Sequence, residues 1–117
     1  MGKAKSALKS QAEMVKRALE FVNDLEKAVK VDGVYVVGSR ARGDYLETSD
    51  IDLVIISGDF RGMNYIQRLE KVGQYLRAGV EAFAFTPEEW ENPSSLFIAE
   101  MKKEAKRLED VLRETKT

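Results

Sequence analysis

The chain has 117 residues with 19 basic and 20 acidic side chains, and it contains neither cysteine nor histidine. These absences exclude disulfides, thiolate and imidazole metal sites, a cysteine nucleophile and a Ser-His-Asp triad. Any catalysis must therefore use carboxylates, Lys, Arg, hydroxyl groups and bound hard cations. The net charge of −1 argues against a broad basic surface for duplex nucleic acid.

The length is typical of one domain, and we expect residues 1–117 to form it. No apolar run approaches the ~20 residues of a membrane span, and the N-terminus lacks the apolar core of a signal peptide. We therefore expect a soluble, cytoplasmic protein without membrane contact.

The first thirty residues predict a long amphipathic helix, because apolar side chains recur at steps of three and four. Its apolar stripe consists of Leu8, Ala12, Val15, Leu19, Val22, Leu25 and Val29. Strands are expected at residues 34–37 and 51–56, and the polar residues 40–49 between them are typical of a turn.

A helix follows at about residues 64–76, and a third strand at residues 80–85. Thr86-Pro87-Glu88-Glu89 has the form of a helix capping box. The last helix is expected from about residue 93 to 113, with one apolar stripe of Phe97, Met101, Ala105, Leu108 and Leu112. The order α-β-β-α-β-α predicts an α+β (α/β) domain, with a small mixed sheet of three or more strands and helices on one side.

The first and last helices bury their stripes either within the monomer or against a partner, which includes a second copy of the chain. Periodicity alone is compatible with both arrangements.

Asp50 and Asp52 flank Ile51 in the second predicted strand, so both carboxylates point to the same side. Two neighbouring carboxylates repel each other, and a divalent cation relieves that repulsion. An all-oxygen ligand set favours Mg²⁺ or Mn²⁺ beside phosphate oxygens. The alternative interpretation is a solvent-exposed strand whose outer face happens to be acidic.

Upstream, the first strand leads directly into Gly38 and Ser39, followed by Arg40 and Arg42. A glycine at a strand end lets the backbone approach a phosphate, while serine and arginine supply donors to its oxygens. The alternatives are an ordinary tight turn, and arginines that pair with nearby surface carboxylates. The whole pattern of strand, Gly-Ser, spacer and Asp-x-Asp favours a phosphate site.

The run VYVVGSRARGDYLETSDIDLVII, residues 34–56, resembles the signature of the DNA polymerase β-like nucleotidyltransferases. That signature is an apolar strand ending in Gly-Ser, a spacer of ten residues or so, and Asp-x-Asp. The short chain, the GSRARG turn and the Ser-Asp before Ile51 resemble the minimal nucleotidyltransferases, often the antitoxins of HEPN-domain toxins. The resemblance covers roughly residues 8–85, and the tail after Thr86 fits the C-terminal helices of such proteins.

The resemblance implies a role for each matching residue. Gly38 and Ser39 would hold the β- and γ-phosphates of a nucleoside triphosphate, and Asp50 and Asp52 would hold two Mg²⁺ ions. The family's third carboxylate, usually aspartate, would here be Glu81, which would join the metal ligands and help to activate the attacking hydroxyl. The alternative for Glu81 is a charge on an edge strand.

Two arginines complete the predicted nucleotide-binding set. We predict Arg40 as a phosphate clamp and Arg42 as the side chain that orders the spacer.

The function that the resemblance implies is transfer of a nucleoside monophosphate, AMP from ATP, to an acceptor hydroxyl. For an antitoxin of this type the acceptor would be a tyrosine of a HEPN-domain partner. One alternative is an inactive binding module that acts by protein contact, in which Glu81 replaces the usual aspartate. Another is an enzyme that modifies a small molecule, although 117 residues leave no room for an extra substrate domain unless a dimer supplies it.

Overall fold

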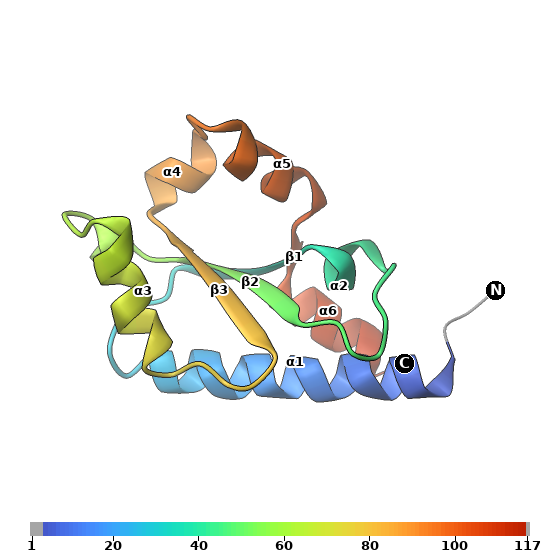
Figure 1. The fold of residues 1–117 in the computed structure, drawn as a ribbon. Coiled ribbons are helices and arrows are strands. Elements are labelled where there is room, and N and C mark those ends of the chain that lie inside the picture. The colour runs from blue at the N-terminus through green and yellow to red at the C-terminus, as the bar shows by residue number, and fades with distance from the viewer. Residues whose placement is uncertain (1–3, 117) are drawn as a thin grey trace.

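The computed structural model describes residues 4–116, so residues 1–3 and 117 of the predicted domain lie outside the described part (Figure 1). The helices are α1 (Lys5–Leu25), α2 (Ser39–Arg42), α3 (Tyr65–Gly73), α4 (Pro87–Glu91), α5 (Leu96–Glu104) and α6 (Leu108–Thr115). The strands are β1 (Gly33–Val37), β2 (Ile51–Ile56), β3 (Val80–Phe85) and β4 (Lys106–Arg107), and a 3₁₀ turn covers Gly58–Phe60. No helix within residues 4–116 is both long and apolar enough to cross a membrane.

The strands form one mixed sheet in the order β3-β2-β1-β4. β1 runs antiparallel to β2 and β4, whereas β2 and β3 are parallel and are joined through the crossover helix α3. The predicted small mixed sheet is confirmed, and β2 and β3 have the predicted bounds. The sheet gains one strand, β4, which the sequence pattern did not indicate.

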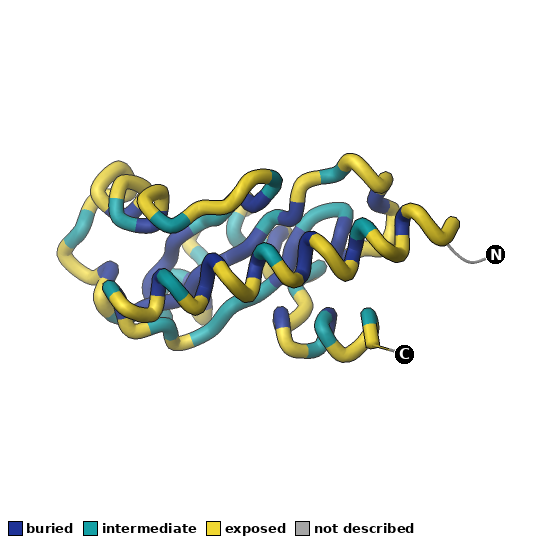
Figure 2. Tube along the Cα trace, turned by 90° about the horizontal axis from the view of Figure 1, so that it is seen from below, coloured by how far each residue is buried: buried dark blue, intermediate teal, exposed yellow. Residues whose placement is uncertain are grey.

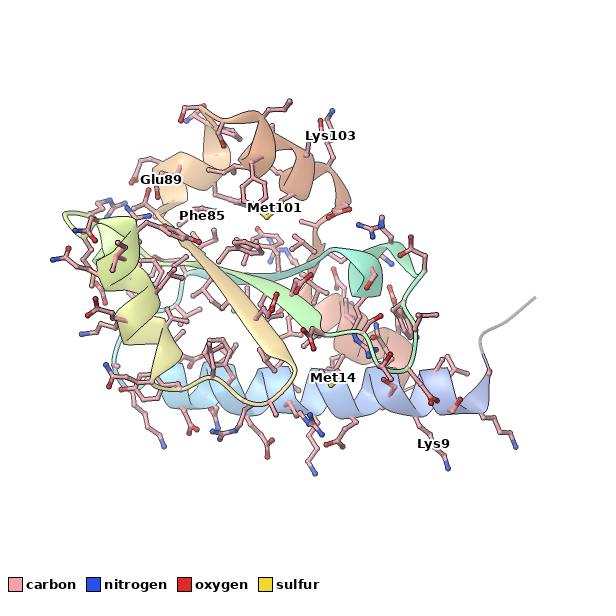
Figure 3. The ribbon with its side chains drawn as sticks, viewed as in Figure 1. Lys9, Met14, Phe85, Glu89, Met101 and Lys103 are labelled. Carbon is pink, nitrogen blue, oxygen red and sulfur yellow. The ribbon has the colours of Figure 1, made fainter. Side chains whose placement is uncertain are left out.

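Helices cover both faces of the sheet, so the expectation of helices on one side is wrong. Figure 1 shows α1 and α6 on one face and α4 and α5 on the other. In Figure 3, Met14 lies on the α1 side, while Phe85 and Met101 lie between the sheet and α4–α5. The reason is the continuous apolar run at the end of β2, from Leu53 to Ile56, which is buried on both faces.

The two faces support two hydrophobic cores. The larger core joins α1, α3 and α6 to one face of the sheet and includes Val15, Phe21, Ile51 and Val111. The smaller core lies under α4 and α5 and consists of Val37, Val54, Ile56, Phe85, Trp90 and Met101.

The predicted helix from residue 93 to 113 is two helices separated by β4, so that expectation is also wrong. Ala105 and Arg107 have extended backbones, and Lys106 and Arg107 pair with Val36 and Tyr35 on the free edge of β1. The break lets the chain pass around the sheet edge. Met101 is thereby buried in the smaller core and Leu108 in the larger one, which a single straight helix could not achieve.

The buried face of α1 is rotated from the predicted stripe. The side chains that it buries are Ala7, Gln11, Met14, Val15, Ala18, Phe21, Val22 and Leu25. Leu8 and Leu19 from the predicted stripe are 52% and 37% exposed. Figure 2 shows the alternation of buried and exposed turns along this helix. Two adjacent apolar stripes fit a 3.6-residue period here, and packing against the sheet selects the one that contains Phe21.

Local capping signals place two of the helix starts. The predicted box before α4 is confirmed, because the Glu89 N–H donates to Thr86 Oγ1 and the Thr86 N–H donates to Glu89 Oε1. A second box, in which Asn64 and Gln67 exchange the same bonds, begins α3. Each box satisfies backbone donors that a helix start leaves free.

The orientation of α1 predicts unequal costs for two substitutions. Phe21→Ala should lower the free energy of unfolding by about 3–5 kcal/mol, because Phe21 is fully buried and its removal leaves a cavity. Leu19→Ala should cost less than about 1 kcal/mol, because this side chain is partly in solvent. Urea unfolding of both variants measures the difference, and equal costs would refute the described orientation.

Candidate active site

The end of β1 brings the backbone against a carboxylate of β2. Gly38 follows β1 with φ of +74°, a conformation that disfavours every residue with a Cβ. A Cβ at this position would also lie only 2.8 Å from Asp52 Oδ2. Glycine is therefore required at residue 38 for two reasons, and the Gly-Ser turn lies next to Asp52 of the Asp-x-Asp segment.

Strand register brings two predicted site carboxylates together. Asp52 on β2 is opposite Val37 of β1 on one side and opposite Glu81 of β3 on the other. Asp52 is half-buried, whereas Glu81 lies exposed on the edge strand β3. The structure therefore joins Gly38, Asp52 and Glu81 at one end of the sheet.

The electrostatic environment of Asp52 is strongly unfavourable to its charge. Burial, followed by the charge and the hydrogen bond of Glu81, raises the pKa of Asp52 to about 6. Asp50 and Glu104 add smaller contributions of the same sign. Asp50 is exposed and lies immediately before β2, rather than inside the strand as expected.

The donor chemistry of these residues fits a divalent cation. The side chains that raise the pKa of Asp52 are all carboxylates, which are the hard ligands that Mg²⁺ prefers. Within residues 4–116, however, no three acidic side chains form a cluster arranged to hold a metal ion. The set of Asp50, Asp52 and Glu81 therefore remains a prediction.

Arg40 lies in a buried network that orders the spacer. Its side chain donates to the Ser49 carbonyl, at 2.9 Å from Nε and 2.6 Å from Nη2, and to Gln11 Oε1 at 2.9 Å from Nη1. The guanidinium also stacks on the Tyr45 ring at 4.7 Å, and only 2% of the residue is exposed. This placement differs from the expected phosphate clamp and gives Arg40 the ordering role that we predicted for Arg42.

Arg42 is the more accessible of the two arginines. Its side chain is 48% exposed, and its guanidinium donates to Glu104 Oε2 at 2.8 Å and to Asp44 at 3.3 Å. The hydrogen bonds to Glu104 and then to Asp44 raise the pKa of Arg42. Arg42 and Ser39 lie in α2, directly after Gly38, so they are close to any group that the turn binds.

Glu104, at the end of α5, is a site residue that the sequence interpretation missed. Its Oε1 accepts from the Gly38 N–H at 2.8 Å, while its Oε2 accepts from Arg42. Residues 38 and 104 are 66 positions apart, and they meet only because β4 pairs with β1. Within a predicted continuous helix, Glu104 carried no signal that would distinguish it from its neighbours.

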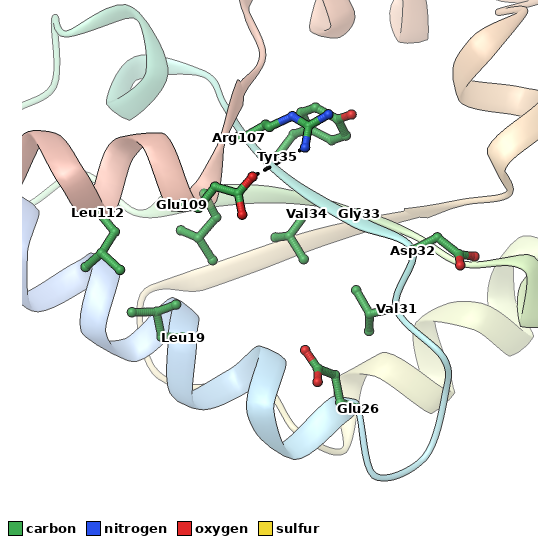
Figure 4. Close-up of a pocket in the computed structure, with 11 residues that line it drawn as sticks. Leu19, Glu26, Val31, Asp32, Gly33, Val34, Tyr35, Arg107, Glu109 and Leu112 are labelled. Carbon is green, nitrogen blue, oxygen red and sulfur yellow. Dashed lines mark hydrogen bonds and ion pairs between the residues drawn. The ribbon is translucent and has the colours of Figure 1, made fainter.

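A separate pocket of about 320 Å³ lies at the other end of β1, between α1, β4 and α6 (Figure 4). Its lining includes Leu19, Val34, Tyr35 and Arg107, and none of the predicted site residues belongs to it. The candidate active site is therefore the open end of the sheet around Asp52 rather than this pocket.

The raised pKa of Asp52 predicts a pH-dependent stability. The folded chain holds the Asp52 proton up to about pH 6, whereas the ordinary pKa is 3.8. The stability that this proton provides is therefore complete below pH 3.8 and is lost as the pH rises through 6. Asp52→Asn should stabilise the protein by about 1 kcal/mol at neutral pH, after discounting for solvent access, and should have little effect near pH 4.

Thermal unfolding of this variant as a function of pH measures the effect, with Glu20→Gln on the exposed face of α1 as the control. An Asp52→Asn effect that is equally large at both pH values would contradict the prediction.

Comparisons with known proteins identify the family of this chain. Residues 15–114 match the sequence model of the family described as nucleotidyltransferase domain. A comparison with curated proteins found no match. A 1.40 Å crystal structure from Sulfolobus solfataricus, of a protein provisionally assigned as a nucleotidyltransferase, is similar with a TM-score of 0.73. The two sequences are 39% identical, and the alignment covers 78% of this chain and 83% of that chain. This chain therefore belongs to the nucleotidyltransferase domain family.

Proposed function

We propose that the protein transfers a nucleoside monophosphate, AMP from ATP, to an acceptor hydroxyl. The observation that carries this proposal is the close approach of the Gly38 turn to Asp52, which in turn is opposite Glu81. A phosphate bound by the turn would lie directly beside these carboxylates. That juxtaposition is what a metal-assisted phosphoryl transfer requires.

In this proposal the turn after β1 binds the triphosphate. The N–H groups and hydroxyl of Gly38 and Ser39 donate to the β- and γ-phosphate oxygens, and Arg42 supplies the positive charge. Arg40 acts indirectly, because its bonds to the Ser49 carbonyl fix the segment that leads into Asp50. Arg42 thereby takes the phosphate contact first predicted for Arg40.

Asp50, Asp52 and Glu81 would hold the Mg²⁺ ions. When bound, these ions would neutralise charge on the triphosphate and stabilise the entering and leaving oxygens. The carboxylates themselves must be ionised to act as ligands, and Asp52 is ionised above its pKa of about 6.

The reaction is an in-line displacement at the α-phosphorus. The acceptor hydroxyl gives its proton to Glu81, its oxygen forms a bond to the α-phosphorus, and the bond to the β-phosphate oxygen breaks. Pyrophosphate leaves with the electron pair of that bond. Positioning and charge neutralisation supply most of the acceleration in such transfers, so the absence of histidine is no obstacle.

We further propose, on the resemblance to minimal nucleotidyltransferases, that the acceptor is a tyrosine of a HEPN-domain toxin. Several large apolar side chains are exposed and are available for a protein partner, among them Ile66, Leu96 and Phe97 at 69%, 76% and 59%.

A second candidate is a binding module that acts without catalysis. Two observations favour it: Glu104 already occupies the Gly38 N–H, and no three-carboxylate metal cluster forms within residues 4–116. This candidate predicts tight partner binding that does not depend on Asp52.

Calorimetric titration of Mg-ATP tests the leading proposal. Wild type should bind Mg-ATP, and either Asp52→Asn or chelation of Mg²⁺ should weaken binding by at least about tenfold, because each removes a metal–carboxylate contact. Glu70→Gln on the exposed face of α3 is the control and should bind like wild type. Binding that is unchanged in Asp52→Asn would exclude the proposed site.

A pair of glycine variants tests the geometry of the turn. Gly38→Ala should reduce Mg-ATP binding by at least about tenfold, because the new Cβ collides with Asp52 Oδ2 and displaces the turn. Gly43→Ala is a matched control, since Gly43 also has a positive φ but has open space around its missing Cβ. Both variants should lose stability, and only Gly38→Ala should lose nucleotide affinity. Equal binding by the two would contradict the proposed turn.

A further inference from the structure

Glu104 lies where the β1–β4 ladder would continue toward the site. Val36 pairs with Lys106 and Tyr35 with Arg107, so the same antiparallel register sets Gly38 opposite Glu104. In a regular ladder the Gly38 N–H would donate to a backbone carbonyl. Here it donates to the side-chain carboxylate of Glu104, at 2.8 Å. The last donor of the ladder is therefore satisfied by a negatively charged carboxylate.

Both oxygens of this carboxylate are used in the way that phosphate oxygens would be. Oε1 accepts from the Gly38 N–H and Oε2 accepts from Arg42 Nη1, each at 2.8 Å. These donors belong to the turn that we propose as the triphosphate site. A carboxylate and a phosphate oxygen are both anionic acceptors, so they compete for the same donors.

We infer that Glu104 occupies this phosphate position in the free protein and sets nucleotide affinity by competing for the Gly38 N–H and Arg42. This inference rests on the proposed function. Nucleotide binding then requires the Glu104 side chain to leave the turn. It is 26% exposed and adjoins solvent, so rotation away from Gly38 does not require the core to open.

The local chemistry makes Glu104 a weakly held competitor. A negative charge at the C-terminal end of α5 is unfavourable for the helix dipole. Glu104 also repels Asp52. Its two hydrogen bonds compensate for both effects in the free protein, and an incoming triphosphate offers the same donors a higher charge.

Calorimetric titration with Mg-ATP, and separately with Mg-tripolyphosphate, tests this inference. Glu104→Ala should bind both ligands at least about tenfold more tightly than wild type, because the competing carboxylate is gone. Glu104→Gln should show a smaller gain, since its amide oxygen still accepts from Gly38 but has no charge. Adding Arg42→Ala to Glu104→Ala should remove most of the gain.

Glu100→Gln is the matched control, because Glu100 lies one turn earlier on α5 and pairs with Lys103 instead of the turn. It should leave the affinity near that of wild type, which excludes a general effect of removing negative charge.

The outcomes separate the two proposals. If wild type binds Mg-ATP through Asp52 but Glu104→Ala binds equally or more weakly, the competition is wrong and the proposed function stands. A loss of thermal stability without a gain in affinity also overturns the competition, because Glu104 then only caps the sheet edge. If neither wild type nor any Glu104 variant binds Mg-ATP, both proposals are wrong.

Discussion

The close approach of the Gly38 backbone to the Asp52 carboxylate organises the whole site. It follows from the β1–β2 register, which sets Val37 opposite Asp52, and from a missing Cβ at the strand end. Any side chain at residue 38 would push the two apart. A group held by the turn must therefore lie beside the Asp52 carboxylate.

That arrangement concentrates negative charge at one end of the sheet. Burial, Glu81, Asp50 and Glu104 all disfavour the ionised form of Asp52. The fold tolerates this electrostatic repulsion around Asp52 because two hydrophobic cores, one on each face of the sheet, hold β2 and its neighbours in register. Charge repulsion that is retained within a well-packed framework is a common feature of functional sites. In the proposed function, a bound cation would relieve this repulsion.

The passage of the chain around the sheet edge links the cores to the site. β4 is only two residues long, yet it joins α5 over one face to α6 over the other. The same short strand brings Glu104 to Gly38 and Arg42. The packing of the two C-terminal helices and the position of Glu104 at the turn therefore depend on the same short strand.

Features that depend on neighbouring residues could be predicted from the sequence alone. These are the strands at 51–56 and 80–85, the capping box at Thr86 and the glycine at the strand end. Four other features depend on packing between segments that are distant in the sequence. They are the buried face of α1, the helices on both faces of the sheet, the break after Glu104 and the burial of Arg40. Periodicity describes a single element, whereas these features depend on what that element packs against. Lys106 and Arg107 form a strand because β1 offers them a free edge, and Glu104 reaches Gly38 across 66 residues for the same reason.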